Sequence, residues 1–336
     1  MSSIDLGLLG PDDDENEKKL AITLQDLVND KTDAASAAKV VDLIVTDDCQ
    51  KALSMYNSAS EDEKTNDSVR GPAPQGWQQY LYDCLASAAM KVPASHPGQD
   101  RLVNLMHELG RLPRHFVPAL YYDPQRIVEK EIWVLTRENN YDGFGQWMWE
   151  RHEGEYQLLT DHVMQRLIRK GAGTFAGWRQ VETDSNAAAG YLNFSAFLAR
   201  LLSSGAASLL GLSALVSPFA TRSIAAAASR EPQRYEPYIA AAAQWILYAG
   251  DTLYEMSEMK VLAMVRWKRE RWDNIKAKFE AAAEDDRFST DAREWATKAV
   301  LSMKRIEEQG AGGKKDVVAS YKFPQLDEDD EEEADK

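Results

Sequence analysis

Residues 191–205 read "YLNFSAFLARLLSSG", a long apolar stretch with the spacing of a helix. Between Asp184 and Arg222 the only charged side chain is Arg200, although 28% of all residues in the chain are charged. On a helical wheel the large apolar residues share one broad face and small residues occupy the opposite face. Such a helix can be covered on both sides. The stretch therefore predicts a core helix of a helical protein.

Arg200 raises the main functional question of this sequence. A buried guanidinium must be paired and hydrogen-bonded, because an unpaired buried charge is strongly unfavourable. One hypothesis is an ion pair with a carboxylate on a neighbouring helix. The other is that Arg200 and Asn193, seven residues apart on one helix side, bind an anionic ligand at the base of a pocket. Trp245, Tyr248 and Tyr254 would then line that pocket.

The rest of the chain also shows helical periodicity, and no segment shows the alternation of a strand. We therefore predict an all-α fold, either a large multi-helix bundle or an irregular helical array. Asp291, followed by Glu294 three residues later, is a good start signal for the last helix. The expected helical segments are 18–29, 34–56, 77–92, 100–112, 124–139, 155–170, 187–204, 212–229, 236–259, 261–284 and 291–308.

These helices are expected to form a single domain over residues 16–309, with the best-defined bundle at 187–309. A polar stretch at about residues 58–76 predicts a flexible loop. The segment before this loop packs on the main domain or forms a separate unit, and the sequence leaves both options open.

Both ends of the chain are acidic. Residues 1–15 contain "PDDDENE", and residues 310–336 finish with "QLDEDDEEEADK". Runs of like charge repel one another and stay solvated, so we expect disordered acidic termini. The first residues also lack the basic start and apolar centre of a secretory signal, which favours a cytoplasmic or nuclear protein that is not secreted.

Composition argues against several classes of partner. A net charge of −15 disfavours binding to nucleic acid or to anionic membrane surfaces. The 21 residues from Leu201 to Thr221 carry no charge, but five serines, two glycines and Pro218 favour a core segment over a membrane span. Cys49 and Cys84 lie in apolar helical surroundings, which predicts buried thiols.

Motifs for cofactors, metals and nucleophiles are incomplete. "GAGGKK" at Gly310–Lys315 lacks the earlier glycine and the following Ser or Thr of a phosphate-binding loop. "GAGTFAG" follows a predicted helix, whereas a dinucleotide fingerprint follows a strand. No two histidines have the four-residue spacing of a zinc-hydrolase helix. We therefore assign no catalytic residue, cofactor or metal ligand; the histidines are His96, His107, His115, His152 and His162.

The segment "RWKRERW", Arg266–Trp272, interleaves cationic and aromatic residues, as nucleic-acid-binding segments do. On a helix, however, Trp267 and Trp272 point roughly 140° apart, so they form no common stacking surface. We expect Trp272 to face the core and the arginines to pair with nearby carboxylates.

Three runs of sequence resemble a known family: "LNFSAFLARL", "AAAQWILYAGDTLYEM", and "RWKRERWDNIKAKF" with the following "AREWATKAVLSMKRIE". The family consists of filamentous-fungal proteins and is catalogued as a domain of unknown function. The resemblance extends from about Trp77 to Glu308 and is strongest after Tyr191. It implies a helical intracellular protein of ascomycete type, brings no catalytic residues, and does not include the acidic termini.

Two functions from different classes remain. We favour a protein–protein interaction adaptor or regulatory scaffold with an unknown protein partner, and we lean away from an enzyme. The alternative is a small-molecule binding protein or enzyme with an anion-binding pocket around Arg200. The two hypotheses make opposite statements about what surrounds that guanidinium.

Overall fold

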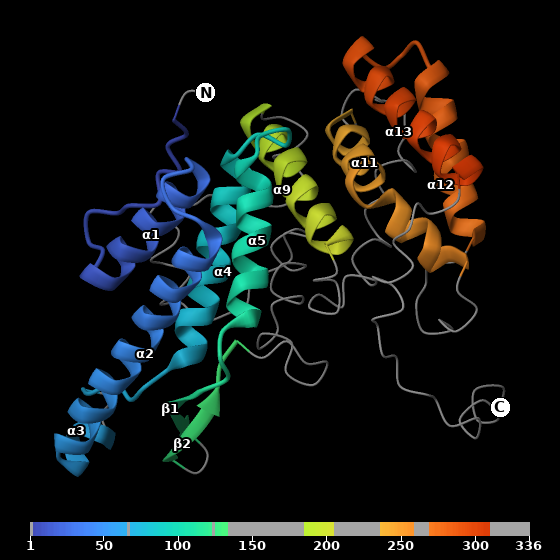
Figure 1. The fold of residues 1–336 in the computed structure, drawn as a ribbon. Helices are drawn as coiled ribbons and strands as arrows, with labels where there is room; N and C mark the ends of the chain where they lie inside the picture. The colour runs from blue at the N-terminus through green and yellow to red at the C-terminus, as the bar shows by residue number, and fades with distance from the viewer. Residues whose placement is uncertain are drawn as a thin grey trace, which may run out of the picture.

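The computed structural model describes residues 3–65, 68–122, 125–133, 185–204, 236–258 and 269–309. Within these ranges the protein is mostly helical, which confirms the all-α prediction, and its β structure is one two-stranded sheet (Figure 1). Helices expected at 155–170 and 212–229 lie outside the described residues, as do His152, His162 and the tail 310–336. The described helices are α1 (Glu15–Val28), α2 (Ala34–Ser58), α3 (Glu61–Thr65), α4 (Pro74–Lys91), α5 (Gly98–Arg111), α9 (Ser185–Ser203), α11 (Glu236–Glu258), α12 (Arg269–Glu284) and α13 (Thr290–Gln309).

The N-terminal segment packs on the helices, which differs from the disordered tail expected for residues 1–15. Leu6 is fully buried, and its backbone N–H donates to Gln25 Oε1 at 2.8 Å. The acidic run ends in a capping box, in which Asp14 Oδ1 accepts from the Glu17 N–H and Glu17 Oε2 accepts from the Asp14 N–H. These acids therefore start α1 by satisfying its free N–H groups.

The sheet is a hairpin of β1 (Phe116–Tyr122) and β2 (Gln125–Glu131), paired antiparallel from Phe116↔Glu131 to Tyr122↔Gln125. The prediction of a helix across residues 124–139 is therefore wrong at β2. The Glu and Lys residues of this segment favoured a helix. Two other signals favour a strand after a turn: the β-branched pair Ile127 and Val128, and the Asp-Pro pair that precedes the strand in the sequence.

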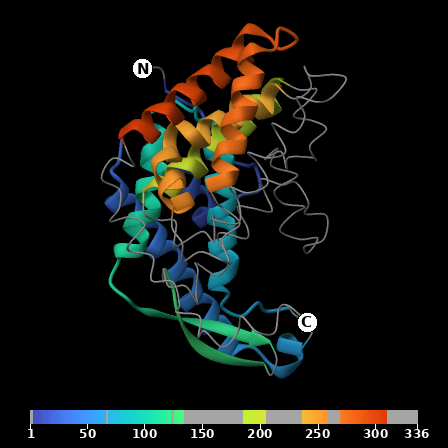
Figure 2. The ribbon, with the colours of Figure 1, turned by 90° about the vertical axis from the view of Figure 1, so that its right-hand side faces the viewer.

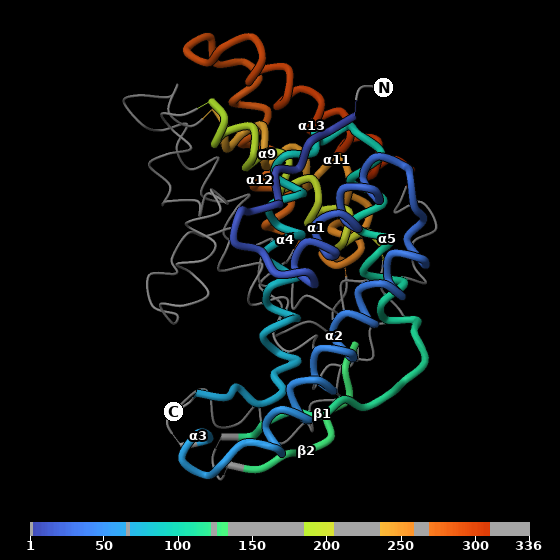
Figure 3. The backbone as a smooth tube through the Cα atoms, turned by 90° about the vertical axis from the view of Figure 1, so that its left-hand side faces the viewer, coloured from blue at the N-terminus to red at the C-terminus, as the bar shows by residue number. Residues whose placement is uncertain are grey.

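Asp42 on α2 fixes the base of this hairpin. Its Oδ1 accepts from Trp133 Nε1 at 2.6 Å and lies 3.2 Å from His115 Nε2. Trp133 is 4% exposed and has a φ of 58°, a conformation that persists only where surrounding contacts enforce it. Figure 3 shows the hairpin beside the lower half of α2.

Two groups of helices share one hydrophobic core. Helices α1, α2, α4 and α5 pack together, and α11, α12 and α13 form a second group. Helix α9 lies between them, because it packs against α4 and α5 on one side and against α11 on the other (Figures 1 and 2). The segment before residue 71 is thus packed on the same core.

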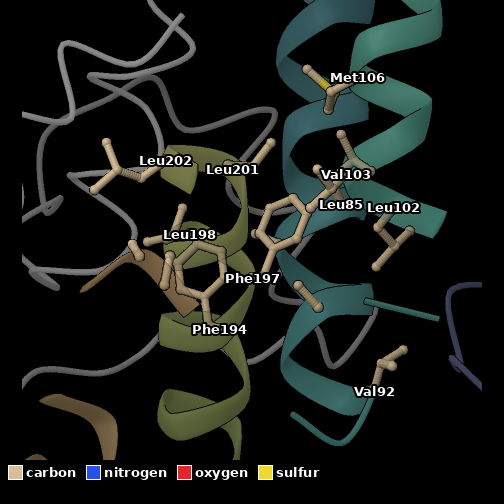
Figure 4. Packing of buried hydrophobic residues seen from close by; sticks show 14 of the residues in the cluster. Leu85, Val92, Leu102, Val103, Met106, Phe194, Phe197, Leu198, Leu201 and Leu202 are labelled. Carbon is tan, nitrogen blue, oxygen red and sulfur yellow. The ribbon is translucent and has the colours of Figure 1, made fainter. Parts of the chain in front are cut away.

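The side chains of α9 show how it joins these groups. Phe197 points from α9 towards Leu85 of α4 and Val103 of α5, and all three are buried (Figure 4). Tyr191 meets Tyr238 near the starts of α9 and α11, at 5.6 Å between ring centroids. Both faces of α9 are therefore covered, as its pattern of large and small residues predicted.

Cys49 and Cys84 are buried free thiols, as predicted. Burial raises the pKa of Cys49 to about 12, so its reactive thiolate form is suppressed. Among the described helices, none combines the length and the apolar character that a bilayer crossing requires.

Gly71 and Pro72, within the segment 58–76, contact the hairpin closely, so we predict opposite effects for substitutions of Gly71 and Gly76. A Cβ at Gly71 would lie 2.8 Å from Leu120 Cβ, next to the point where the Leu120 N–H donates to Pro72 O. Gly71→Ala should lower the free energy of unfolding by about 1–3 kcal/mol through overpacking.

Gly76, exposed in the first turn of α4, is the matched control. A Cβ added at Gly76 would lie 4.0 Å from Ala73 Cβ, its nearest contact. Gly76→Ala should therefore raise the free energy of unfolding by about 0.5–1 kcal/mol. Urea unfolding measures both, and equal effects of the two substitutions would contradict this packing.

Candidate functional site

Arg200 on α9 binds the loop that joins α4 to α5. Its residue is 8% exposed, and Nη2 donates to the backbone oxygen of Ala94 at 2.6 Å. Nε donates to Asp100 Oδ1 at 2.9 Å, and Nη1 donates to Ala196 O at 3.3 Å. Each of the three guanidinium nitrogens thus has an acceptor within the chain.

Tyr248 on α11 contacts Arg200 as well. The guanidinium carbon lies 3.6 Å from the centroid of the Tyr248 ring, which is cation–π geometry. The Tyr248 hydroxyl donates to Ala94 O at 3.2 Å. Residues of α9 and α11 therefore donate to the same backbone oxygen, and one loop residue links three parts of the chain.

Asn193, two turns before Arg200 on α9, binds the same loop. Its Oδ1 accepts from the Ala94 N–H at 2.8 Å, and its Nδ2 donates to Met90 O at 2.9 Å. Gln99, fully buried in α5, donates from Nε2 to Val92 O at 2.7 Å and to Asn193 O at 3.3 Å. Both polar groups of Ala94 are consequently satisfied by side chains of α9 and α11.

The ion pair with Asp100 contributes less than its short distance suggests. The Asp100 side chain is 65% exposed, and ion pairs with exposed partners are worth about 0–1 kcal/mol. The contacts of Arg200 with Ala94 O and with the Tyr248 ring lie deeper, where water competes less. We infer that these two contacts hold the guanidinium and that Asp100 neutralises it.

Trp245 and Tyr254 do not join this group. Trp245 is 1% exposed within the core, and its Nε1 has no hydrogen-bond acceptor among the described residues. Tyr254 lies near α12, where its hydroxyl accepts from Arg269 Nη1 at 2.7 Å and its ring meets Trp272 edge-on at 5.2 Å. Of the five residues predicted to form a pocket, the structure thus brings together Arg200, Asn193 and Tyr248.

The cluster around Tyr254 is a network between α11, α12 and α13. Arg269 pairs with Glu258 at 2.7 Å, while Trp272 is fully buried and donates from Nε1 to Glu307 at 2.9 Å. Burial would raise the pKa of Glu307, but hydrogen bonds from Lys276 and Trp272 lower it overall. The expected pattern of a core tryptophan with a carboxylate-paired arginine is confirmed for Trp272 and Arg269; Arg266 and Trp267 lie outside the described residues.

Two residues of the Arg200 site, Ala94 and Asp100, were missed by sequence reasoning. They lie about a hundred positions before Arg200, and nothing in their local sequence marks them as its partners. In the described ranges, no three His, Cys, Asp or Glu side chains gather as a metal site. His107 instead pairs through Nε2 with Ser204 Oγ at 2.8 Å.

A family model described as "Protein of unknown function (DUF3632)" matches residues 82–292, more than half of the chain. The chain belongs to this family. No curated protein and no solved structure matches it. The matched range contains Ala94, Asp100, α9 and α11, so the whole Arg200 site lies within the family domain, whereas α1 and α2 precede it.

We predict that Asn193→Ala lowers the free energy of unfolding by about 1–3 kcal/mol, because it leaves the Ala94 N–H and the Met90 oxygen without partners. Asn274→Ala, at an exposed position of α12, is the control and should change stability by less than about 0.5 kcal/mol. Denaturant unfolding followed by tryptophan fluorescence measures both values. An Asn193 variant as stable as the Asn274 variant would show that the loop is held by other contacts.

Proposed function

We propose that this protein is an intracellular adaptor or regulatory scaffold that binds another protein, in the cytoplasm or nucleus of a filamentous fungus. One observation carries the proposal. Arg200, on which the two hypotheses disagree, donates from all three guanidinium nitrogens to groups of its own chain. This supports a structural role for the cation, and the binding role then falls to the outer surface.

Among the described residues, two aromatic side chains on one strand are exposed. Aromatic residues are common anchors of protein interfaces, because they bury much apolar area with little loss of conformational entropy. Phe116 is 59% exposed and Tyr121 is 52% exposed, and both lie on β1. Figure 1 shows β1 at the opposite end of the described fold from α13. We place partner binding on this strand, with a partner whose surface offers an apolar pocket for an aromatic ring.

The test uses the full-length protein as bait in fungal lysate. The expected result is a stoichiometric partner that is lost or weakened at least tenfold by Phe116→Ser or Tyr121→Ser, since an aromatic anchor contributes about 2 kcal/mol or more. Leu301→Ser removes an equally exposed side chain, 62% accessible on α13, and should retain the partner.

Binding is measured by quantitative mass spectrometry of the captured proteins, after confirming that each variant unfolds at the wild-type urea concentration. Failure to capture any stoichiometric partner would contradict the adaptor role. A partner that both hairpin variants retain would place the interface away from β1.

The anion-binding alternative keeps one supporting observation, the 65% exposure of Asp100, because a dissolved anion has access to the place of this carboxylate. Asp100→Asn tests this alternative, because it removes the carboxylate charge that would compete with a dissolved anion for Arg200 Nε. Under the adaptor proposal, the variant loses less than about 1 kcal/mol of stability, and phosphate or citrate leaves its melting temperature unchanged.

Arg200→Gln is the matched variant for this experiment. A melting temperature that rises with phosphate or citrate in the wild type, rises further in Asp100→Asn and stays constant in Arg200→Gln would favour the small-molecule binder. That pattern would overturn the adaptor as the primary role.

A further inference from the structure

His96 lies in the same loop as Ala94 and makes an unusual hydrogen bond. Its ring nitrogen Nδ1 accepts from the Gly98 N–H, the first residue of α5, at 3.0 Å. A histidine ring nitrogen accepts only when it carries no proton. The observed loop therefore requires a neutral imidazole with its hydrogen on Nε2.

The backbone holds the imidazole close to the start of α5. The His96 N–H donates to Pro93 O at 2.8 Å, and His96 O accepts from the Gln99 N–H at 3.0 Å. Gly98 is buried, and a Cβ there would lie 2.9 Å from His96 Nδ1 and 3.0 Å from Val28 Cγ1. The ring and the helix start are thus in tight contact, so a proton added at Nδ1 would face the Gly98 N–H.

The surroundings disfavour a positive charge on this ring. The N-terminus of α5 carries partial positive charge, and Arg101 follows one turn later. Burial and the Arg101 charge both lower the pKa of His96. The neighbouring carboxylates already have partners, since Asp30 pairs with Arg101 at 2.9 Å and Asp100 pairs with Arg200 at 2.9 Å.

The loop that carries His96 also contacts α9 and α11. Ala94, two residues earlier, is held by Asn193 and Arg200 of α9 and by Tyr248 of α11. Movement of the backbone at Gly98 would therefore reach the residues next to these contacts. Charged side chains on the adjoining elements also include Lys91 at the end of α4, and Lys31 after α1, which pairs with Asp26 at 3.3 Å.

We propose that His96 is a pH-sensitive latch: protonation of its imidazole releases the Gly98 N–H, opens the loop at residues 92–97 and weakens the hold of α4 and α5 on α9 and α11. The latch is closed when the imidazole is neutral. This regulation is built from the fold itself and does not depend on the adaptor proposal.

The direction of the pH dependence follows from the two states of the loop. An open loop leaves His96 with an ordinary pKa near 6.5, whereas the closed loop has a lower one. The open state therefore binds more protons as the pH falls below about 6.5. The free energy that favours the closed loop over the open loop is largest above pH 6.5 and decreases as the pH falls through this value. It becomes constant below the pKa of His96 in the closed loop.

The experiment compares the full-length wild type with His96→Asn by amide hydrogen exchange at pH 7.5 and pH 5.5. Asparagine is the matched variant, because its side-chain oxygen accepts from the N–H two residues later but does not titrate. In the wild type, the protection factors of Ala94 and Gly98 should fall by up to about tenfold at the lower pH. This limit holds for a single group with a pKa of about 6.5 that binds a proton only in the open loop, because pH 5.5 lies one unit below that pKa. In His96→Asn they should stay constant.

His107 provides a second control. Burial also lowers its pKa, and it lies at the far end of α5, so His107→Gln should retain the acid response at Ala94. A response of His96→Asn equal to that of the wild type would overturn the latch. Imidazole nitrogen NMR of the wild type at pH 7.5 gives an independent check, and a proton on Nδ1 of His96 would also refute the proposal.

Discussion

The fold depends on one backbone oxygen, that of Ala94, and on the buried cation that binds it. A guanidinium in apolar surroundings needs acceptors, and the backbone of a short loop supplies a buried one. Tyr248 donates to the same oxygen and covers the guanidinium with its ring. The desolvation cost of Arg200 is thereby offset by contacts that fix the α4–α5 loop, α9 and α11 relative to one another.

Helix α9 can occupy its central position because its residues suit two kinds of neighbour. Phe197 fills the space next to α4 and α5 (Figure 4), and the small residues of α9 are buried as well, in a helix that packs closely against α11. Arg200 and Asn193 lie at the border between these faces, where the loop passes. Polar contacts therefore fix the register of the helices at the line where two apolar interfaces meet.

The sequence predicted the helical class and the need for a partner to Arg200, because periodicity and the energetics of a buried charge are local properties. The identity of that partner depends on how distant segments meet, and Asp100 has an ordinary sequence context. The separation of Tyr254 from Tyr248 could be predicted from the sequence, because residues six positions apart on a helix point about 120° apart. Two local signals were also present but outweighed by composition: the capping pair Asp14 and Glu17 in the acidic run, and the turn before β2.

The docking of the first helices has a consequence for the boundaries of the family domain. The matched range begins at residue 82, yet Val28 of α1 lies against the start of α5, and Leu20 and Leu24 belong to the common core. A polypeptide cut at that boundary would expose the apolar face that α1 and α2 cover. The range that the family model matches and the common hydrophobic core thus differ in extent, and a polypeptide limited to that range would need another element to shield the same surface.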